Sequence, residues 1–431
     1  MSLTKTVGFV AVTTLAMSGA AFGAELNNDM QSQIAELKAE IAALKGAEGG
    51  QWLTEQRAAE IRGIVTDVLA DADTRSSLQG AAAGSGYNGG FFLSSADGNY
   101  SMKINVLEQI RYSFNHSESG ATTTEASGFE NKRTRLSFGG NVVDSTWSYK
   151  LSYYLGYSNS NENFGASELA DASVTKDFNN GFTVTVGQFK LPFSAEYGMD
   201  VANLQFNEYS IVNHEFSIGY GQGIAFGYNS DQFRVAGGYV NALNQVNEAW
   251  NGSSPDTDWT IAARAEFKIS GDWAQFNDAQ SWKGEGAGMM AGLGYAGSAD
   301  DTTDANASEL TVDFTADFGG ANIAAAYYWA DPDDGSGSNP TGYTLSAGAF
   351  VADDCEIVAR YEAIDNDAGT ENGFFTLGAN WYMAKNSAKV GIDFGYSMDD
   401  LAGGAGDYLF TNMVPADDGE WVIQAQMSLS F

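Results

Sequence analysis

The sequence predicts an all-β protein: a transmembrane antiparallel β-barrel of about 16 strands, preceded by a short N-terminal α-helical or coiled-coil segment. Three observations predict this fold. The N-terminus is typical of exported proteins, no later apolar run is long enough for a membrane helix, and apolar and polar residues alternate repeatedly along the chain. Because only helices and closed barrels satisfy their backbone groups inside a bilayer, a membrane protein without membrane helices must be a barrel.

Residues 1–23 are typical of a secretory signal peptide. Lys5 supplies an early positive charge, an apolar run extends from Val7 to Met17, and small residues follow from Ser18 to Ala21. The apolar run is too short to span a bilayer as a helix. We therefore expect the protein to be exported, and the bacterial outer membrane is its predicted location.

Two segments with helical periodicity follow the signal. Residues 24–46 carry apolar side chains at alternating steps of four and three, as in a short coiled coil. These side chains are Met30, Ile34, Leu37, Ile41 and Leu44. Coiled-coil self-association and a single amphipathic helix on the periplasmic side both remain open. Residues 51–79 are a second predicted helical segment, and residues 80–98 are a predicted flexible linker of small residues.

The predicted barrel covers residues 99–431, where segments of about ten residues alternate between an apolar and a polar face. The last twelve residues are the clearest example, and only Val422 breaks their pattern. One face carries Trp421, Ile423, Ala425, Met427, Leu429 and Phe431, and the other carries Glu420, Gln424, Gln426, Ser428 and Ser430. An edge strand of a soluble sandwich would look similar. The terminal aromatic, however, resembles the signature that outer-membrane barrels present to their assembly machinery.

The composition agrees with a barrel and excludes nucleic-acid binding. The chain has 51 Gly, 20 Tyr and 26 Phe but only 5 Pro, which suits many strands with aromatic girdles. Acidic residues outnumber basic ones by 55 to 21, giving a net charge of -34, and such a charge repels nucleic acid. The single cysteine, Cys355, has no partner for an intramolecular disulfide, and we expect it to be inert.

Catalytic and cofactor chemistry is not indicated. His116 and His214 are the only histidines, and neither accompanies a Gly-x-Ser-x-Gly elbow or a second histidine at metal-binding spacing. We therefore predict that the protein is not an enzyme, and we expect no metal and no cofactor.

One block of sequence resembles a known family. Residues 187–196 read Gly-Gln-Phe-Lys-Leu-Pro-Phe-Ser-Ala-Glu, and no strand pattern follows for about twenty residues. A strand that ends in this way and enters a long loop resembles the phosphate-selective porin O and P family. Residues 91–100 and the preceding helical segment are similar to planctomycete-type members. The resemblance implies a trimeric diffusion channel in which the loop at residues 193–216 narrows the lumen.

The charges along the predicted lumen favour a modified version of that expectation. By strand parity a basic wall is predicted, consisting of Arg111, Arg133, Arg135, Lys150 and Lys190. The expected constriction loop is acidic and has no Lys or Arg between residues 191 and 218; its carboxylates are Glu196, Asp200, Glu208 and Glu215. An anion would meet an unfavourable field at such a loop unless the basic wall lies opposite.

We therefore expect a general porin for small hydrophilic solutes and ions that favours cations or selects weakly. Three alternatives stay open: a phosphate- or anion-selective channel as the family name implies, charges that only solvate the lumen, and a structural barrel that tethers the envelope. The expected partners are outer-membrane lipid, two further copies of the chain, the barrel assembly machinery and small solutes.

Overall fold

The computed structural model describes residues 35–39, 63–66, 84–119, 122–155, 167–241, 259–300, 305–332, 337–367, 371–399 and 419–431. The chain divides into two units, Met1–Ala81 and Ala82–Phe431. The described residues of the first unit are two short helical pieces, at 35–39 and 63–66. The predicted signal peptide and most of the two predicted helical segments lie outside the described residues. Within the described ranges no helix has the length and apolarity needed to cross a membrane.

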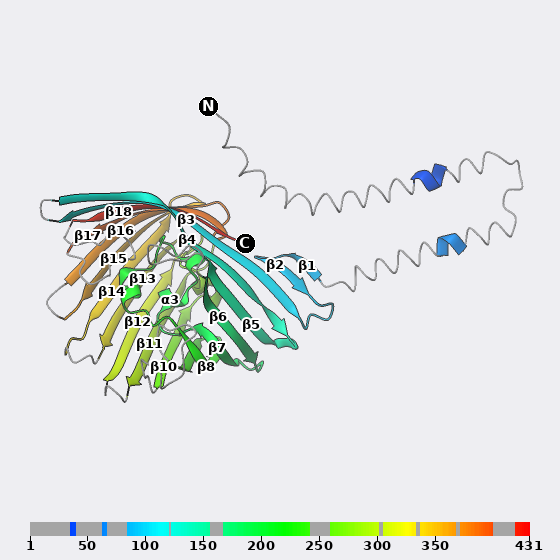
Figure 1. Cartoon of the computed structure of the whole chain (residues 1–431), viewed down its shortest axis with the longest axis horizontal. Coiled ribbons are helices and arrows are strands. Elements are labelled where there is room, and N and C mark those ends of the chain that lie inside the picture. Colours follow the sequence, from blue (N-terminus) through cyan, green and yellow to red (C-terminus); the bar gives the residue numbers. More distant parts are fainter. Residues whose placement is uncertain are drawn as a thin grey trace, which may run out of the picture. The chain divides into compact units, whose positions relative to one another are not determined.

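The second unit contains a closed barrel of sixteen antiparallel strands in its described part, β3 to β18 (Figure 1). Each strand pairs with the next along the chain, and β18 pairs back with β3. The predicted fold class is therefore confirmed. The strands are β3 Ser101–Ser119, β4 Thr122–Val142, β5 Asp144–Leu155, β6 Ser167–Asp177, β7 Phe182–Lys190, β8 Tyr220–Asn229, β9 Phe233–Val240, β10 Trp259–Ser270, β11 Gly288–Asp300, β12 Ala305–Asp317, β13 Ala321–Asp331, β14 Thr341–Phe350, β15 Cys355–Asp365, β16 Glu371–Tyr382, β17 Ala388–Ser397 and β18 Trp421–Ser430.

A hairpin precedes the barrel and corrects one prediction. Residues 80–98 were predicted as a flexible linker, but β1 (Gly84–Tyr87) and β2 (Phe91–Ser94) pair within them. The backbone of Phe431 exchanges hydrogen bonds of 2.7 and 3.0 Å with Val106. The part of β3 before Val106 does not pair with β18. β2 pairs with this part of β3. The pairing of β2 with β3 orders the small residues of this segment, and composition alone does not reveal such a pairing.

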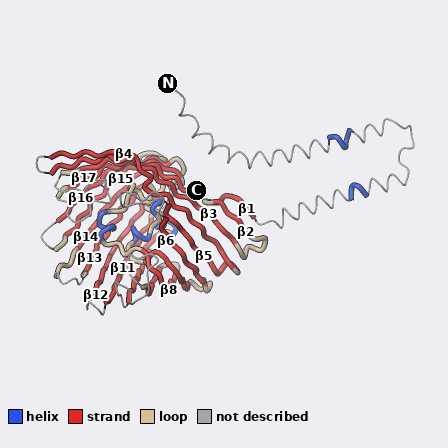
Figure 2. Tube along the Cα trace, in the orientation of Figure 1, coloured by secondary structure: helices blue, strands red, loops and turns tan. Residues whose placement is uncertain are grey.

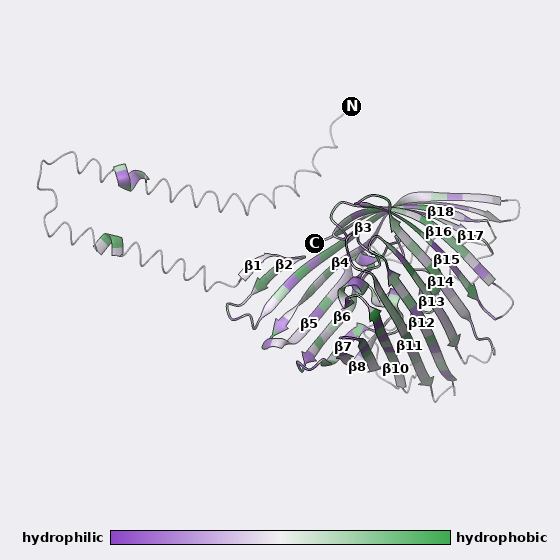
Figure 3. Cartoon of the chain, turned by 180° about the vertical axis from the view of Figure 1, so that it is seen from behind, coloured by the Kyte–Doolittle hydropathy of each residue, from purple (hydrophilic) through white to green (hydrophobic). Residues whose placement is uncertain are grey.

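The strands alternate between two faces as the sequence predicts. Ile261, Leu293 and Ile392 point outward and are exposed, whereas their strand neighbours Thr260, Gly294 and Asp393 point into the lumen. Figure 3 shows hydrophobic and hydrophilic residues intermixed along the strands, as this alternation requires. Val422, the exception in the last strand, faces inward and is 2% exposed because it packs against other apolar residues in the lumen.

The connections differ between the two ends of the barrel. At the end where β3 begins and β18 ends, short turns such as 178–181 and 318–320 join the strands. Gly181, Gly319 and Gly320 have φ values of 85°, 70° and 128°, which only glycine adopts readily. We call this the short-turn end; in outer-membrane barrels it faces the periplasm. One connection there is long: residues 271–287, which contain the 3-10 helix η2 (Trp273–Asn277).

Candidate functional site

Residues 191–219, between β7 and β8, fold into the barrel, and we call them the constriction loop. They contain α3 (Ala195–Gly198), η1 (Val201–Asn203) and α4 (Ile211–Glu215). Figure 2 shows these short helices among the surrounding strands. Side chains cap each turn: Ser194 accepts from the Tyr197 amide at 3.1 Å, and Asp200 and Ser210 cap the next two. The loop is therefore an ordered element rather than a loose connection.

Apolar side chains seat the loop against the inner wall. Phe193, Ile211, Val212, Phe216 and Ile218 pack in one buried cluster with side chains of the wall, including Tyr328, Ile364, Phe374 and Val422. Gly342 on β14 makes this approach possible. A Cβ at that position would lie 2.7 Å from Val212 Cγ1 and 2.8 Å from the Phe216 ring, which is closer than van der Waals contact permits.

Glu208 is the centre of an ionic clamp between the loop and strands β3 and β4. Its carboxylate lies 3.1 Å from Arg111 Nη2, hydrogen bonds to Arg133, and lies 3.6 Å from Lys132 Nζ and 3.7 Å from His214 Nε2. A β-bulge in β4, between its pairings with Gln109 and Ile110, adds one residue, so Lys132 and Arg133 both contact Glu208 from the lumen side.

The electrostatics of the clamp follow from these contacts. The Glu208 side chain is 2% exposed, and burial alone would raise its pKa. The surrounding charges of Arg133, Lys132 and Arg111, with a hydrogen bond from His214, instead hold the pKa well below its ordinary value. Glu208 is therefore a carboxylate at every physiological pH, and the clamp is ionic.

Two further contacts hold the first part of the loop. Arg135 Nη2 donates to both carboxylate oxygens of Asp200, at 2.9 and 2.7 Å, and this pair keeps the pKa of Asp200 below its ordinary value in spite of burial. Lys190 donates to the Tyr197 carbonyl at 2.6 Å and lies 4.3 Å from the centre of the Tyr197 ring.

The loop also contacts the strands that lie beyond β18. Gln205 donates to Glu356 Oε1 at 2.7 Å, and the Asn207 amide donates to Asp393 Oδ2 at 2.7 Å. Arg360 donates to the carbonyl of Glu208 at 3.2 Å. The loop is therefore bound along an arc of the wall that runs from β15 through β18 to β4.

The structure brings together only some of the predicted basic-wall and loop residues. Glu196 accepts from the amide and hydroxyl of Ser210, at 2.7 and 2.6 Å, and lies 3.6 Å from Arg360, which is outside the predicted basic wall. Lys150 pairs with Asp171 of β6, at 3.0 Å. Glu215 is exposed at the end of α4 and makes no ion pair with the part of the wall that the structure describes.

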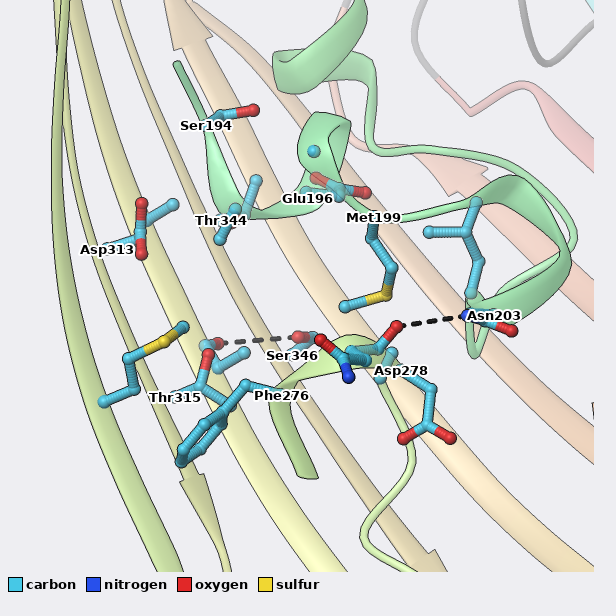
Figure 4. A pocket seen from close by; sticks show the side chains of 18 of the residues that line it. Ser194, Glu196, Met199, Asn203, Phe276, Asp278, Asp313, Thr315, Thr344 and Ser346 are labelled. Atoms are coloured by element: carbon cyan, nitrogen blue, oxygen red, sulfur yellow. Dashed lines mark hydrogen bonds between the residues drawn. The ribbon is translucent and has the colours of Figure 1, made fainter. Parts of the chain in front are cut away.

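A cavity of about 430 Å³ lies between the loop and strands β9 to β14 (Figure 4). The inner face is lined there by small side chains, which leave the space open: Thr315, Ala324, Ala326, Thr344 and Ser346. Six carboxylates line the cavity against four cationic side chains. They are Glu196, Asp200, Glu208, Glu266, Asp278 and Asp313, against Lys190, Arg234, Arg264 and Arg360.

Arg264 is the best-paired cation of this cavity, and no sequence motif marked its role. Its guanidinium makes a bidentate pair with Asp313, at 2.6 and 2.8 Å, and donates to Glu266 at 2.9 Å. It also donates to the carbonyl of Phe193 at 2.8 Å, which links β10 to the constriction loop. Parity alone places Arg264 in the lumen, but it does not identify these partners.

A closed barrel with a long loop folded across its lumen defines a porin. The family model for the phosphate-selective porin O and P matches residues 104–330, more than half of the chain, and the chain belongs to this family. It is therefore a channel of the bacterial outer membrane for passive diffusion, and the resemblance noted in the sequence is confirmed. No curated protein sequence matches the chain.

Solved structures of porins share the fold. An anion-selective porin from Comamonas acidovorans is 15% identical, with a TM-score of 0.55 over 77% of this chain and 99% of that chain. Salmonella typhi OmpF, in a complex with daunomycin, is 12% identical, with a TM-score of 0.53 over 81% of this chain and 100% of that chain. At these identities the likeness concerns the fold alone.

Proposed function

We propose that this porin passes small hydrophilic solutes and ions with a preference for cations. The observation that carries the proposal is that the predicted basic wall is paired with the loop. Arg111 and Arg133 form ion pairs with Glu208, and Arg135 forms one with Asp200. The whole lining of the cavity consists of six carboxylates and four cationic side chains, and this net negative charge attracts cations and repels anions in a confined pore.

Anion selectivity is the second candidate, and one observation favours it. The single carboxylate of Glu208 faces Arg111, Lys132 and Arg133, so the clamp itself has a positive excess. Lys150 adds a side chain that is 58% exposed. If permeating ions follow this side of the loop, the pore selects anions, as the family description suggests.

The reversal potential separates the two candidates. The purified mature protein is inserted in a planar bilayer under a gradient of dilute KCl, since low salt keeps fixed charges unscreened. A potential that corresponds to K⁺ permeation, with conductance unaffected by phosphate, supports the cation-favouring pore. A Cl⁻ potential with block by inorganic phosphate overturns it in favour of the second candidate. A potential near zero also overturns it and indicates that the lumen charges only solvate the pore.

We further propose processing after residue 23, recognition of the C-terminal strand by the assembly machinery, and a homotrimer in outer-membrane lipid. Intact mass tests the processing, and light scattering of the detergent-solubilised protein tests the trimer. Deletion of Asn28–Lys45, from the predicted coiled coil at 24–46, tests the alternative of an envelope tether. Retained conductance with an intact envelope argues against the tether, whereas retained conductance with a leaky envelope supports it.

A further inference from the structure

The connection at residues 271–287 meets the constriction loop inside the barrel. Asn203 of the loop donates to the Asn277 carbonyl at 3.1 Å, and its own carbonyl accepts from the Ala279 amide at 3.1 Å. Gln280 donates to the Leu204 carbonyl at 3.0 Å. The constriction loop starts from the opposite end of the barrel, so the two segments approach the lumen from opposite sides and are hydrogen bonded where they meet.

Asp278 lies between the two residues whose backbones bind the loop. Its Oδ2 accepts from Trp282 Nε1 at 3.0 Å and from Asn386 Nδ2 at 3.4 Å, so the side chain is held from the connection and from the turn between β16 and β17. Asp278 lines the same cavity as Glu196. Figure 4 shows the two carboxylates in different parts of that cavity, Glu196 on the constriction loop and Asp278 on the 271–287 connection.

We propose that the 271–287 connection is a second constriction element, and that Asp278 determines ion selectivity at the short-turn mouth of the pore. This inference rests on one part of the proposed function, namely that ions pass through the cavity. An ion that leaves the cavity toward the short-turn end passes a carboxylate that two hydrogen-bond donors and two backbone contacts fix in place. A fixed charge at a narrow exit acts on every permeating ion, whereas a mobile surface charge is screened.

The charged groups around Asp278 come from three further places. Glu285 lies on the same connection and Asp317 on β12, while Lys385 lies in the turn before β17 and Lys389 at the start of β17. Burial, opposed by the Trp282 hydrogen bond and assisted by Glu285, raises the pKa of Asp278 to about 6. The carboxylate is thus charged at neutral pH and loses its charge as the pH falls through about 6.

The test compares three variants of the full-length porin by reversal potential. D278N removes the charge but keeps an oxygen that accepts from Trp282, and D278E keeps the charge. D353N is the matched control because Asp353 is at the same end, in the turn before β15, with a fully exposed side chain beyond the cavity. Retention of the SDS-resistant folded band confirms that each variant is a barrel.

We expect D278N to lower the K⁺/Cl⁻ permeability ratio by about tenfold, because loss of one charge roughly 6 Å from the ion path in water disfavours K⁺ about threefold and favours Cl⁻ about threefold. D278E and D353N should retain the wild-type ratio. Acidification from about pH 7.5 to about pH 5 should lower the wild-type ratio more than it lowers the ratio of D278N. An unchanged ratio in D278N, an equal loss in D353N, or an equal loss in D278E would each overturn the proposal.

The two proposals fail separately. If the wild type prefers Cl⁻ and D278N prefers it further, the proposed cation preference is wrong and the role of Asp278 stands. If the wild type prefers K⁺ and D278N matches it, the cation preference stands and the role of Asp278 is refuted.

Discussion

Replacing Glu208 by glutamine tests whether charge holds the constriction loop in place. The substitution keeps the shape and removes the carboxylate that Arg111, Lys132 and Arg133 share. Removing one partner of a buried ion pair typically costs about 3–5 kcal/mol, because the remaining charges stay buried and uncompensated. This cost corresponds to a change of about 10²- to 10⁴-fold in the equilibrium between the docked and released loop.

The loop should not leave the lumen altogether in this variant. The Arg135 pair with Asp200 and the hydrogen bond from Asn207 to Asp393 remain. We therefore expect partial release: larger and noisier single-channel currents in planar bilayers, and a reversal potential shifted toward anions because two arginines become accessible. E215Q is the control, since it removes the same charge from an exposed position of the same loop. Wild-type conductance, noise and selectivity in E208Q would refute the clamp.

Three other perturbations follow from the same geometry. Since the pKa of Glu208 is depressed below its ordinary 4.5, the clamp is fully present above that pH and is lost only as the pH falls through the lower, folded value. Open-channel noise should therefore stay constant from about pH 7.5 to about pH 4.5, and a rise near pH 6 would contradict the ionic clamp. Gly342→Val places side-chain atoms against Val212 and should destabilise the barrel by about 1–3 kcal/mol, seen as a lower temperature of SDS-induced unfolding. Gly237→Ala, where a Cβ has 3.7 Å of clearance, should match the wild type, and equal midpoints in both variants would refute the steric argument. Asn203→Ala removes one hydrogen bond of about 0.5–1.5 kcal/mol to the 271–287 connection and should increase current fluctuations without changing selectivity, so an unaltered noise spectrum would count against the contact.

The strands could be predicted from the sequence because their signal is local. Alternation along β18 assigns Ile423 and Met427 to the outer face and Gln424 and Gln426 to the lumen, and the exposed fractions agree. Parity likewise assigns Arg111, Arg133 and Arg135 to the lumen. Each of these assignments depends on a residue and its two neighbours.

The partners within the lumen could not be predicted because they depend on long-range approach. Lys132 contacts Glu208 only because a bulge adds a residue to β4, and strict alternation contains no sign of it. Lys150 pairs with Asp171 on the neighbouring strand, a partner that alternation along one strand does not identify. The hairpin at β1 and β2 forms on an edge of β3 that exists only after β18 has closed the barrel.

The distribution of side-chain size around the barrel explains how one loop can both cross the lumen and leave a path. On β3, β4 and β15 the inward side chains that bind the loop are long and charged, such as Arg111, Arg133 and Arg360, and they reach the loop backbone or its carboxylates. On β12 to β14 several inward side chains that line the cavity are small, such as Ala324 and Thr344, although Asn322 and Tyr328 of β13 contact the loop. The acidic residues of the loop thus find cations on one side and open space on the other. Docking neutralises the loop where it is held, and the carboxylates that line the open side set the field along the path.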